Sequence, residues 1–502
     1  MLKSREAADG DGIENPYVEV INPCPFNCGL CPRHKSHTAL LNLVVTNRCD
    51  LGCWYCFFYA AAVGYVFEPT LTHIRYMLES AREQRPIPAK AVQITGGEPT
   101  LRSDLIEIIK LAKELGYKHV QLNTHGIAFA YNPGLAKKVR EAGVNTIYLS
   151  FDGLTPYTNP KNHWEIPYIL EACKNACMGV VLVPTVIKNV NLHEVGKMVL
   201  FGLKHNDVVR GVNFQPISIV GRVPKSEREA MRVTIPDVIK VVEEETQGQI
   251  RTEDWYTVPF TLAISRFVEA LTGEPQFKLS NHFACGVATY AIQDRKTGKV
   301  TTIPQFIKVN DLRDYLMQLT EYIKKGGSKK IALLKLLFKL NSLIEWDKVP
   351  ENLRKRKRLL WILFKIFAKH DYNALGQFHY NTLFIGMMHF MDEYNYDVAR
   401  VERCDIHYVM PDGRVIPFCT YNVFPEIYRD KAFKLYGIPL NKWYAKHGIK
   451  SFSEVRYKRN IRKLESNPIY RKYYEGFWDP DSISYEEKKR ISIRFGIPVI
   501  ED

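Results

Sequence analysis

The chain has 502 residues, of which 46% are hydrophobic and 25% are charged. This is the composition of a globular protein, and it excludes a disordered or collagen-like chain. The length predicts a large catalytic domain with one or two smaller units. Lys and Arg (69) outnumber Asp and Glu (54), and the net charge of +15 favours an anionic partner: nucleic acid, phosphates or an anionic membrane surface. Charge alone does not choose among these partners.

The sequence contains no apolar run of the ~20 residues that cross a bilayer, so a membrane-spanning protein is not expected. Residues 1–16 lack the apolar stretch of a secretory signal, which favours a cytoplasmic location. The 11 cysteines are an odd number and are clustered. In the reducing cytosol, clustered cysteines favour metal binding over disulfides.

Six apolar, β-rich runs dominate the first half of the chain, and the segments between them contain helical patterns. Strands that alternate with helices predict a parallel α/β sheet with crossover connections. Six units are too few for an eight-fold barrel, so we expect a partial (β/α)6 barrel with its chemistry at the C-terminal strand ends. The six runs are residues 41–47, 91–96, 119–125, 146–151, 180–187 and 211–217.

The composition changes beyond the sixth run. Residues 236–400 are expected to be mainly helical, and they contain two apolar-basic segments, 329–344 and 354–370. The following region has β-hairpin character around the turn PDGRV, and the last fifty residues are charged and Tyr-rich without a recognisable motif. The chain is therefore expected to have four parts, at residues 1–35, 36–235, 236–400 and 401–502.

Cys49, Cys53 and Cys56 form a C-x3-C-x2-C motif directly after the first predicted strand. Three thiolates on a short loop can hold three irons of a [4Fe–4S] cluster and leave the fourth iron open. The open iron can chelate the amino and carboxylate groups of S-adenosylmethionine, whose reductive cleavage yields a 5′-deoxyadenosyl radical. The alternatives are a structural zinc site and buried structural cysteines.

Together with its surroundings, this motif resembles the radical S-adenosylmethionine (radical SAM) superfamily. Tyr55 precedes the third cysteine, and the second predicted strand ends in Gly96-Gly97-Glu98-Pro99. The resemblance implies that this backbone and the Glu98 carboxylate hold the methionyl amine of the cofactor. It also implies that polar residues after the later strands contact the ribose or carboxylate of the cofactor. These are Ser150, Asp152 and Asn191.

A second C-x3-C-x2-C motif, at Cys24, Cys28 and Cys31, lies upstream. We expect it to bind an auxiliary [4Fe–4S] cluster for electron relay or for holding an intermediate. The alternative is a zinc site that uses His34 or His37 as its fourth ligand.

Cys285, Cys404 and Cys419 stand beside hairpin-like segments. Their pattern resembles the C-terminal, SPASM-type auxiliary-cluster domains of the same superfamily, so a third cluster is expected here. The alternative is that they are simple buried cysteines. Cys173 and Cys177 share a predicted helix face, which favours core packing.

Most of the chain resembles one archaeal radical SAM group to which two functions attach. The first is tetraether lipid synthesis, in which isoprenoid chains of archaeal diether phospholipids are joined. The second is C-methylation of 7,8-dihydro-6-hydroxymethylpterin in methanopterin biosynthesis. Lipid coupling ranks first here because segments 329–344 and 354–370 combine apolar faces with cations. On this view, the basic run 354–358 lies near the mouth of a cavity walled by Trp361, Phe364 or Phe367.

The expected partners follow from this ranking: an anionic archaeal phospholipid as substrate, an electron donor such as a ferredoxin or flavodoxin, and peripheral contact with a membrane surface. Nucleic acid is not expected, because an alternating aromatic and basic platform is missing. A non-enzyme alternative is an iron–sulfur electron carrier or a zinc-dependent RNA-binding protein. The lipid synthases also carry an N-terminal rubredoxin-like segment with paired cysteines, and no cysteine precedes Cys24 in this sequence.

Overall fold

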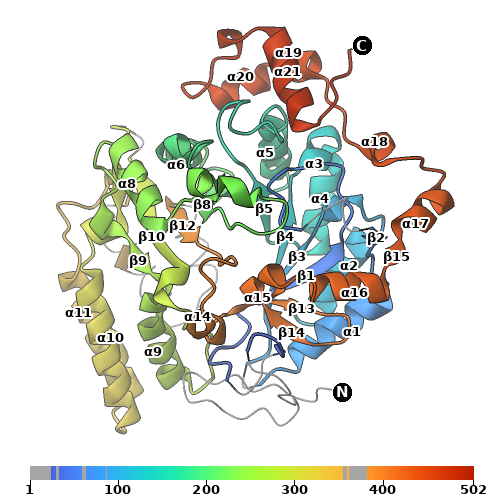
Figure 1. The fold of residues 1–502 in the computed structure, drawn as a ribbon. Coiled ribbons are helices and arrows are strands. Elements are labelled where there is room, and N and C mark those ends of the chain that lie inside the picture. Colours follow the sequence, from blue (N-terminus) through green and yellow to red (C-terminus); the bar gives the residue numbers. More distant parts are fainter. Residues whose placement is uncertain are drawn as a thin grey trace.

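One mixed sheet organises the fold of the computed structural model (Figure 1). Within the described residues its strand order is β11-β10-β12-β8-β6-β5-β4-β3-β1-β13-β14, and β7 and β9 pair with β8 and β10. The structure describes residues 24–29, 33–58, 64–85, 87–294, 296–353, 359–360 and 381–501.

The six central strands run parallel to one another, as the six apolar runs predicted. Helices connect successive strands and cover the outer face of the sheet (Figure 1). This arrangement confirms the partial barrel. The strands are β1 (Leu40–Thr46), β3 (Ala91–Gly96), β4 (His119–Thr124), β5 (Thr146–Ser150), β6 (Gly179–Val183) and β8 (Val209–Pro216), with β7 (Thr185–Val186) beside β8. The helices are α1 (Leu71–Arg82), α2 (Leu105–Glu114), α3 (Ile127–Tyr131), α4 (Pro133–Ala142), α5 (Ile166–Asn175) and α6 (Val195–Lys204).

Helix α2 shows why these segments fold as predicted. Its apolar residues recur at helical spacing, and Leu105, Ile108 and Ile109 are buried against the sheet. Helix α2 ends just before Gly116, and α4 ends at Ala142 with Gly143 as its C-cap, which is where glycine commonly terminates helices. The hydrophobic core therefore lies between the helices and the outer face of the strands.

Both edges of the parallel sheet are extended by later parts of the chain. β12 pairs in parallel with β8, and β13 pairs in parallel with β1. The region expected to be mainly helical therefore contributes strands to the same sheet as the barrel. Its strands are β9 (Tyr256–Thr257), β10 (Gly286–Gln293), β11 (Val300–Thr302) and β12 (Leu383–Met388). Its helices are α8 (Ile235–Glu245), α9 (Leu262–Thr272), α10 (Val309–Lys324), α11 (Lys329–Ser342) and α14 (Val398–Glu402), after the short α7 (Arg228–Met231).

The expected hairpin near residue 411 is formed by β13 (Ile406–Val409) and β14 (Val415–Pro417), which pair antiparallel. It leads directly into α15 (Phe418–Val423), a short buried helix. The hairpin thus brings Cys404 and Cys419 beside the start of β1.

The charged, Tyr-rich C-terminal stretch has no recognisable motif, yet it packs closely on the barrel. Tyr470 and Tyr474 are fully buried in the main core with Trp164, and Figure 1 shows α19 to α21 beside α5. β15 (Ile438–Pro439) pairs with β2 (Tyr65–Val66). The helices of this stretch are α16 (Arg429–Tyr436), α17 (Leu440–His447), α18 (Phe452–Val455), α19 (Ile461–Ser466), α20 (Pro468–Tyr474) and α21 (Tyr485–Phe495).

The two cysteines near the end of α5 differ in burial. Cys173 is buried in the core as expected, but Cys177 is exposed, because α5 ends before it and the backbone turns to a φ of 52° there.

Among the described residues, no helix is both long and apolar enough to cross a membrane.

Candidate active site

A cavity of about 220 Å³ opens at the C-terminal ends of the barrel strands. Its wall combines residues that follow several different strands, which is where partial barrels are expected to carry their chemistry. The wall includes Cys49, Cys53, Tyr55, Cys56, Gly96, Gly97, Asn123, His125, Ser150, Lys161, Thr185 and Gln215.

The cysteine loop follows β1 and borders this cavity with all three of its thiols. Cys49, Cys53 and Cys56 are half-buried, and none forms a disulfide. Burial raises the pKa of Cys53 to about 12 and that of Cys49 well above its usual value. Thiols in such a setting ionise only when a cation compensates the charge, so the donor set fits an iron–sulfur cluster.

The glycine pair after β3 lies against the cysteine loop. A Cβ atom on Gly96 would overlap the carbonyl oxygen of Thr46, and one on Gly97 would overlap that of Arg48. Gly96 also has a φ of 151°, which side chains disfavour. The amide of Gly97 donates to Thr46 O at 2.8 Å, so the loop after β1 and the turn after β3 are joined directly. This close approach leaves bare backbone at the cavity wall.

Glu98 does not line the cavity. Its buried carboxylate accepts hydrogen bonds from Thr100 Oγ1 at 2.6 Å, Thr124 Oγ1 at 2.7 Å and the amide of His125 at 3.0 Å. The side chain therefore fixes the ends of β3 and β4 to each other. The resemblance to the superfamily predicts that this carboxylate helps to hold the cofactor amine. In the structure Gly96 and Gly97 reach the wall, and the carboxylate of Glu98 lies behind them.

His125 is a cavity residue that the sequence did not single out. Its Nε2 lies 2.8 Å from Asp50 Oδ1 and 3.2 Å from Glu98 Oε2. Burial alone would lower the pKa of this imidazole, but Glu98 and Asp50 together raise it to about 9. Cys49, Asp50 and His125 place their ligand atoms within 4.8 Å of one another. The imidazole thus brings a positive charge next to the first cluster thiol.

Tyr55, Asp152 and Lys161 form a second buried polar group at the wall. Lys161 Nζ lies 2.6 Å from Asp152 Oδ2 and 3.1 Å from the hydroxyl of Tyr55, which itself donates to Asp152. The amide of Thr185 holds the other Asp152 oxygen at 3.0 Å. Because Lys161 is buried and borders the cavity, it presents a cation there. The sequence contains 69 Lys and Arg residues, and nothing in it singles out Lys161. Only the fold shows that this lysine borders the cavity.

Ser150 and Asn191 occupy different positions around this group. Ser150 lines the cavity. Asn191 lies behind the wall, where its Nδ2 donates to the carbonyls of Asp152 at 2.7 Å and Thr185 at 2.8 Å. Asn191 therefore supports the backbone that carries Asp152, and it does not border the cavity itself.

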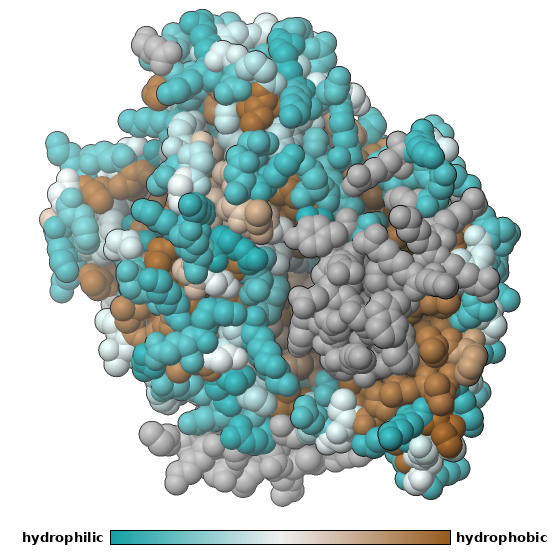
Figure 2. All heavy atoms as spheres, turned by 180° about the vertical axis from the view of Figure 1, so that it is seen from behind, coloured by the Kyte–Doolittle hydropathy of each residue, from teal (hydrophilic) through white to brown (hydrophobic). Residues whose placement is uncertain are grey.

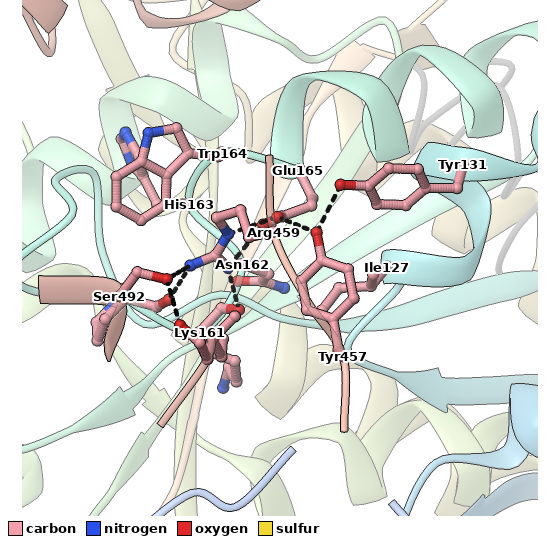
Figure 3. A network of polar contacts seen from close by, with 12 residues as sticks. Ile127, Tyr131, Lys161, Asn162, His163, Trp164, Glu165, Tyr457, Arg459 and Ser492 are labelled. Carbon is pink, nitrogen blue, oxygen red and sulfur yellow. Dashed lines mark hydrogen bonds and ion pairs between the residues drawn. The ribbon is translucent and has the colours of Figure 1, made fainter. Parts of the chain in front are cut away.

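The C-terminal stretch holds the loop that carries Lys161. Figure 3 shows Arg459 among residues of this loop. Its guanidinium pairs with Glu165, with Nε 2.6 Å from Oε1, and donates to the backbone carbonyls of Pro160 at 3.0 Å and Lys161 at 2.8 Å. Both charged side chains are fully buried. Arg459 thus fixes the backbone of the loop at Pro160 and Lys161.

Tyr457 extends the same network to the cysteine loop. Its hydroxyl donates to Glu165 at 2.7 Å and contacts the hydroxyl of Tyr131 at 2.7 Å (Figure 3). Its backbone amide donates to the carbonyl of Asp50 at 3.1 Å. The C-terminal stretch therefore joins the loop next to Cys49 to the loop of Lys161, a connection that no local sequence pattern predicted.

A second, smaller cavity of about 30 Å³ is bordered by three more cysteines, Cys285, Cys404 and Cys419. Burial raises the pKa of all three thiols, that of Cys419 to about 12. Cys419 lies on the wall of both this cavity and the larger one. Cys285, just before β10, and the two cysteines that flank the hairpin thus form a second group of three thiols directly beside the first cavity.

The upstream motif is described only in part, because Cys31 lies outside the described residues. Cys24 and Cys28 contact each other, and this contact together with burial raises the pKa of Cys28 far above its usual value. The two histidines considered as zinc ligands have other contacts. His34 Nε2 lies 2.7 Å from the carbonyl of Cys404, and His37 Nε2 accepts from the amide of Lys278.

Comparison with known proteins also supports the resemblance to the radical SAM superfamily. Residues 43–202 match the sequence profile of the Radical SAM superfamily. The 7,8-dihydro-6-hydroxymethylpterin dimethyltransferase of Methanocaldococcus jannaschii is 45% identical over 444 residues, which cover 87% of this chain and 86% of that protein. A probable GTP 3′,8-cyclase of the same organism is 27% identical over 35% of this chain and 59% of that protein.

Two solved structures are weakly similar to part of this chain. The FeFe-hydrogenase maturase HydG from Carboxydothermus hydrogenoformans matches 43% of this chain and 53% of its own, with 13% identity and a TM-score of 0.32. Methylornithine synthase matches 43% of this chain and 64% of its own, with 13% identity and a TM-score of 0.31.

Proposed function

Because the chain belongs to the radical SAM superfamily, and within it to the family of the M. jannaschii 7,8-dihydro-6-hydroxymethylpterin dimethyltransferase, we propose that it is a radical SAM methyltransferase acting on that pterin. The observation that carries the proposal is the 45% identity over 87% of the chain, which extends far beyond the barrel.

Tetraether lipid synthesis, the function ranked first from the sequence, is contradicted. The relative that matches nearly the whole chain bears the name of a pterin dimethyltransferase, which was the alternative. The ranking depended on segments 329–344 and 354–370, and of the second segment residues 354–358, Trp361, Phe364 and Phe367 lie outside the described residues. An apolar-basic segment is a property of composition, and it does not identify what the catalytic cavity contains.

The residues of the large cavity fit the cofactors of a radical SAM enzyme. Cys49, Cys53 and Cys56 would hold a [4Fe–4S] cluster, and the bare backbone of Gly96 and Gly97 would flank S-adenosylmethionine. When bound, these groups supply a 5′-deoxyadenosyl radical that abstracts hydrogen from carbon. The protein's own contribution is to orient the cofactor and to exclude water from a buried site.

Charged side chains around the cavity support binding of an amino acid moiety such as the methionyl part of the cofactor. Lys161 presents a cation at the wall, and Asp152 and Tyr55 fix its position. A carboxylate placed there would gain a charge-assisted hydrogen bond in a setting of low dielectric constant. His125 adds a second positive charge on the side of Cys49.

The remainder of the wall supports a flat, polar heterocycle as substrate. One part of it carries amides and hydroxyls, where Gln93 Nε2 donates to Asn42 Oδ1 at 2.7 Å and Asn123 Nδ2 donates to Thr95 Oγ1 at 3.1 Å. Another part is aromatic and includes the stacked pair Phe390 and Phe418, whose ring centroids are 4.0 Å apart. A pterin needs hydrogen-bonding groups at its edge and apolar contact on its faces.

The two other cysteine groups support further clusters. Cys285, Cys404 and Cys419 would ligate one, and Cys24 and Cys28 with Cys31 would ligate another. Such clusters would pass electrons from a ferredoxin or flavodoxin, or would hold an intermediate. Iron and sulfide analysis of anaerobically purified protein tests this. A Cys404→Ala variant should lose about one cluster's iron, whereas Cys177→Ala, at an exposed cysteine, should lose none.

The proposed reaction is tested in cells that supply the methyl donor. Anaerobic expression of the chain together with 7,8-dihydro-6-hydroxymethylpterin should produce methylated pterins, detected by mass spectrometry. A Cys49→Ala variant should produce none, because a thiolate that anchors the cluster is lost. With purified, reconstituted protein, the pterin should also stimulate formation of 5′-deoxyadenosine. Unmethylated pterin in cells that contain active, cofactor-cleaving protein would overturn the proposal.

A further inference from the structure

Helix α11 has apolar residues on two opposite faces. Ala332, Leu336 and Leu340 are buried against α10 and its neighbours. On the other side, Ile331, Leu334 and Phe338 are exposed, with 46%, 55% and 76% of their surface accessible. Residues spaced by three, four and seven positions share a helix face, so these three side chains form one continuous outer stripe. Large apolar residues gathered in this way mark a contact surface.

Lysines flank this stripe on both sides. Lys330 precedes it, and Lys335 and Lys339 lie along its other flank, with their ammonium groups over the rings of Tyr322 and Tyr315. Helix α11, residues 329–342, contains no acidic residue. Lys324, Lys325 and Lys329 add exposed cations where α10 ends and α11 begins.

The α10–α11 pair lies at the periphery of the molecule, away from the barrel (Figure 1). Figure 2 views the molecule from behind. In that view hydrophobic atoms gather at the lower right, the side on which α10 and α11 lie. None of the residues of α11 borders the catalytic cavity. Contact with this surface is therefore separable from cofactor chemistry.

We propose that the outer face of α11 docks on an anionic phospholipid membrane. The stripe would enter the boundary between headgroups and acyl chains, and the flanking lysines would contact anionic headgroups, as in-plane amphipathic helices do. Charge complementarity selects this occupant, since the helix has cations on both flanks and no carboxylate to match a basic partner. The lysine stems also let their ammonium groups reach the headgroup level. The inference does not depend on the substrate, because the surface and the cavity are separate.

The test is co-sedimentation of the full-length holoenzyme with vesicles. Vesicles that contain phosphatidylglycerol should bind it, and pure phosphatidylcholine vesicles should bind it far less. Leu334→Ser combined with Phe338→Ser should reduce binding about tenfold or more, because the inserted apolar side chains are lost. Lys330→Gln and Lys335→Gln should each weaken it about five-fold at low salt. Leu435→Ser, at a 67% exposed leucine on α16, and Lys446→Gln on α17 are the matched controls and should bind normally.

Each variant should cleave S-adenosylmethionine at the normal rate, which verifies its fold. Equal binding of the wild-type protein to both kinds of vesicle, or unchanged binding of the Leu334/Phe338 variant, would overturn the proposal. So would a vesicle-independent dimer that these substitutions convert to monomer, because the stripe would then be a surface between two copies. Loss of pterin methylation with normal vesicle binding would count against the proposed function alone.

Discussion

Arg459 and Glu165 form a fully buried ion pair that ties the C-terminal stretch to the barrel, with Nε and Oε1 2.6 Å apart. The same guanidinium binds the backbone of Lys161. The position of a cation at the catalytic cavity therefore depends on a residue that lies outside every recognisable motif of the sequence.

Glu165→Gln should lower the free energy of unfolding by about 3–5 kcal/mol, since it leaves the buried Arg459 charge without its partner. Thermal and urea unfolding would measure the loss. Replacing both residues by apolar ones, Glu165→Leu with Arg459→Met, should cost less than the single change. Glu141→Gln, which breaks an exposed pair with Lys137 at 3.9 Å, should change stability by less than about 1 kcal/mol. Equal effects of the buried and exposed changes would contradict the network's role.

Lys161→Met should raise the KM for S-adenosylmethionine by about tenfold or more, because one charged hydrogen bond to a carboxylate is worth roughly 1.5–3 kcal/mol. The physical reason is the loss of the only cation that Asp152 and Tyr55 hold at this part of the described cavity wall. Steady-state formation of 5′-deoxyadenosine measures it, and Lys137→Met on the exposed face of α4 is the control. An unchanged KM would show that the carboxylate binds elsewhere.

Gly97→Ala should abolish cofactor cleavage, because the added methyl group would overlap the carbonyl oxygen of Arg48 and force the turn after β3 away from the cysteine loop. Backbone cannot yield as a flexible side chain would. The visible absorption of the reconstituted cluster and the cleavage rate should fall together. Gly134→Ala on α4, where the nearest atom is a side-chain oxygen at 3.4 Å, should be neutral or slightly stabilising. Normal activity in Gly97→Ala would contradict the close approach.

His163 should make the fold sensitive to acid. Burial, with Arg459 and Lys488 nearby, holds its pKa well below the usual value, so the folded state keeps it neutral. The unfolded chain binds the proton below about pH 6.5, and stability is therefore complete above that pH and declines as the pH falls, by up to about 1.4 kcal/mol per pH unit. Urea unfolding between pH 7.5 and 5 measures the slope. His163→Gln should have a shallower slope, and an identical slope would refute the assignment.

The sequence predicted the parts of the fold that depend on local patterns. Apolar runs and helical spacing located all six barrel strands, and the cysteine and Gly96-Gly97 motifs that the sequence singled out both lie at the wall of the cavity. Contacts made by residues far apart in the chain could not be predicted. Arg459 meets Glu165 only because α19 to α21 pack on the barrel, and nothing near Arg459 in the sequence indicates this.

Two predicted site residues follow strands as expected, and their side chains support the cavity wall from behind. Asn191 and Glu98 both follow strands, where side chains generally face the cavity. Whether such a side chain lines the wall or supports it depends on small differences in the turn that follows. Those differences come from tertiary hydrogen bonds, such as the bond from Thr124 to Glu98, which the sequence does not specify.

The hydrogen bond between Tyr457 and Asp50 also bears on the order of chain folding and cluster loading during synthesis. During synthesis the cysteine loop emerges early, whereas β13 and the segment that carries Tyr457 emerge last. For most of translation the loop therefore remains accessible to proteins that deliver iron and sulfide. We expect cluster loading to be fastest in this interval and slower once residues 456–501 have docked. Labelling of Cys49 with a thiol reagent in stalled nascent chains would reveal when access is lost.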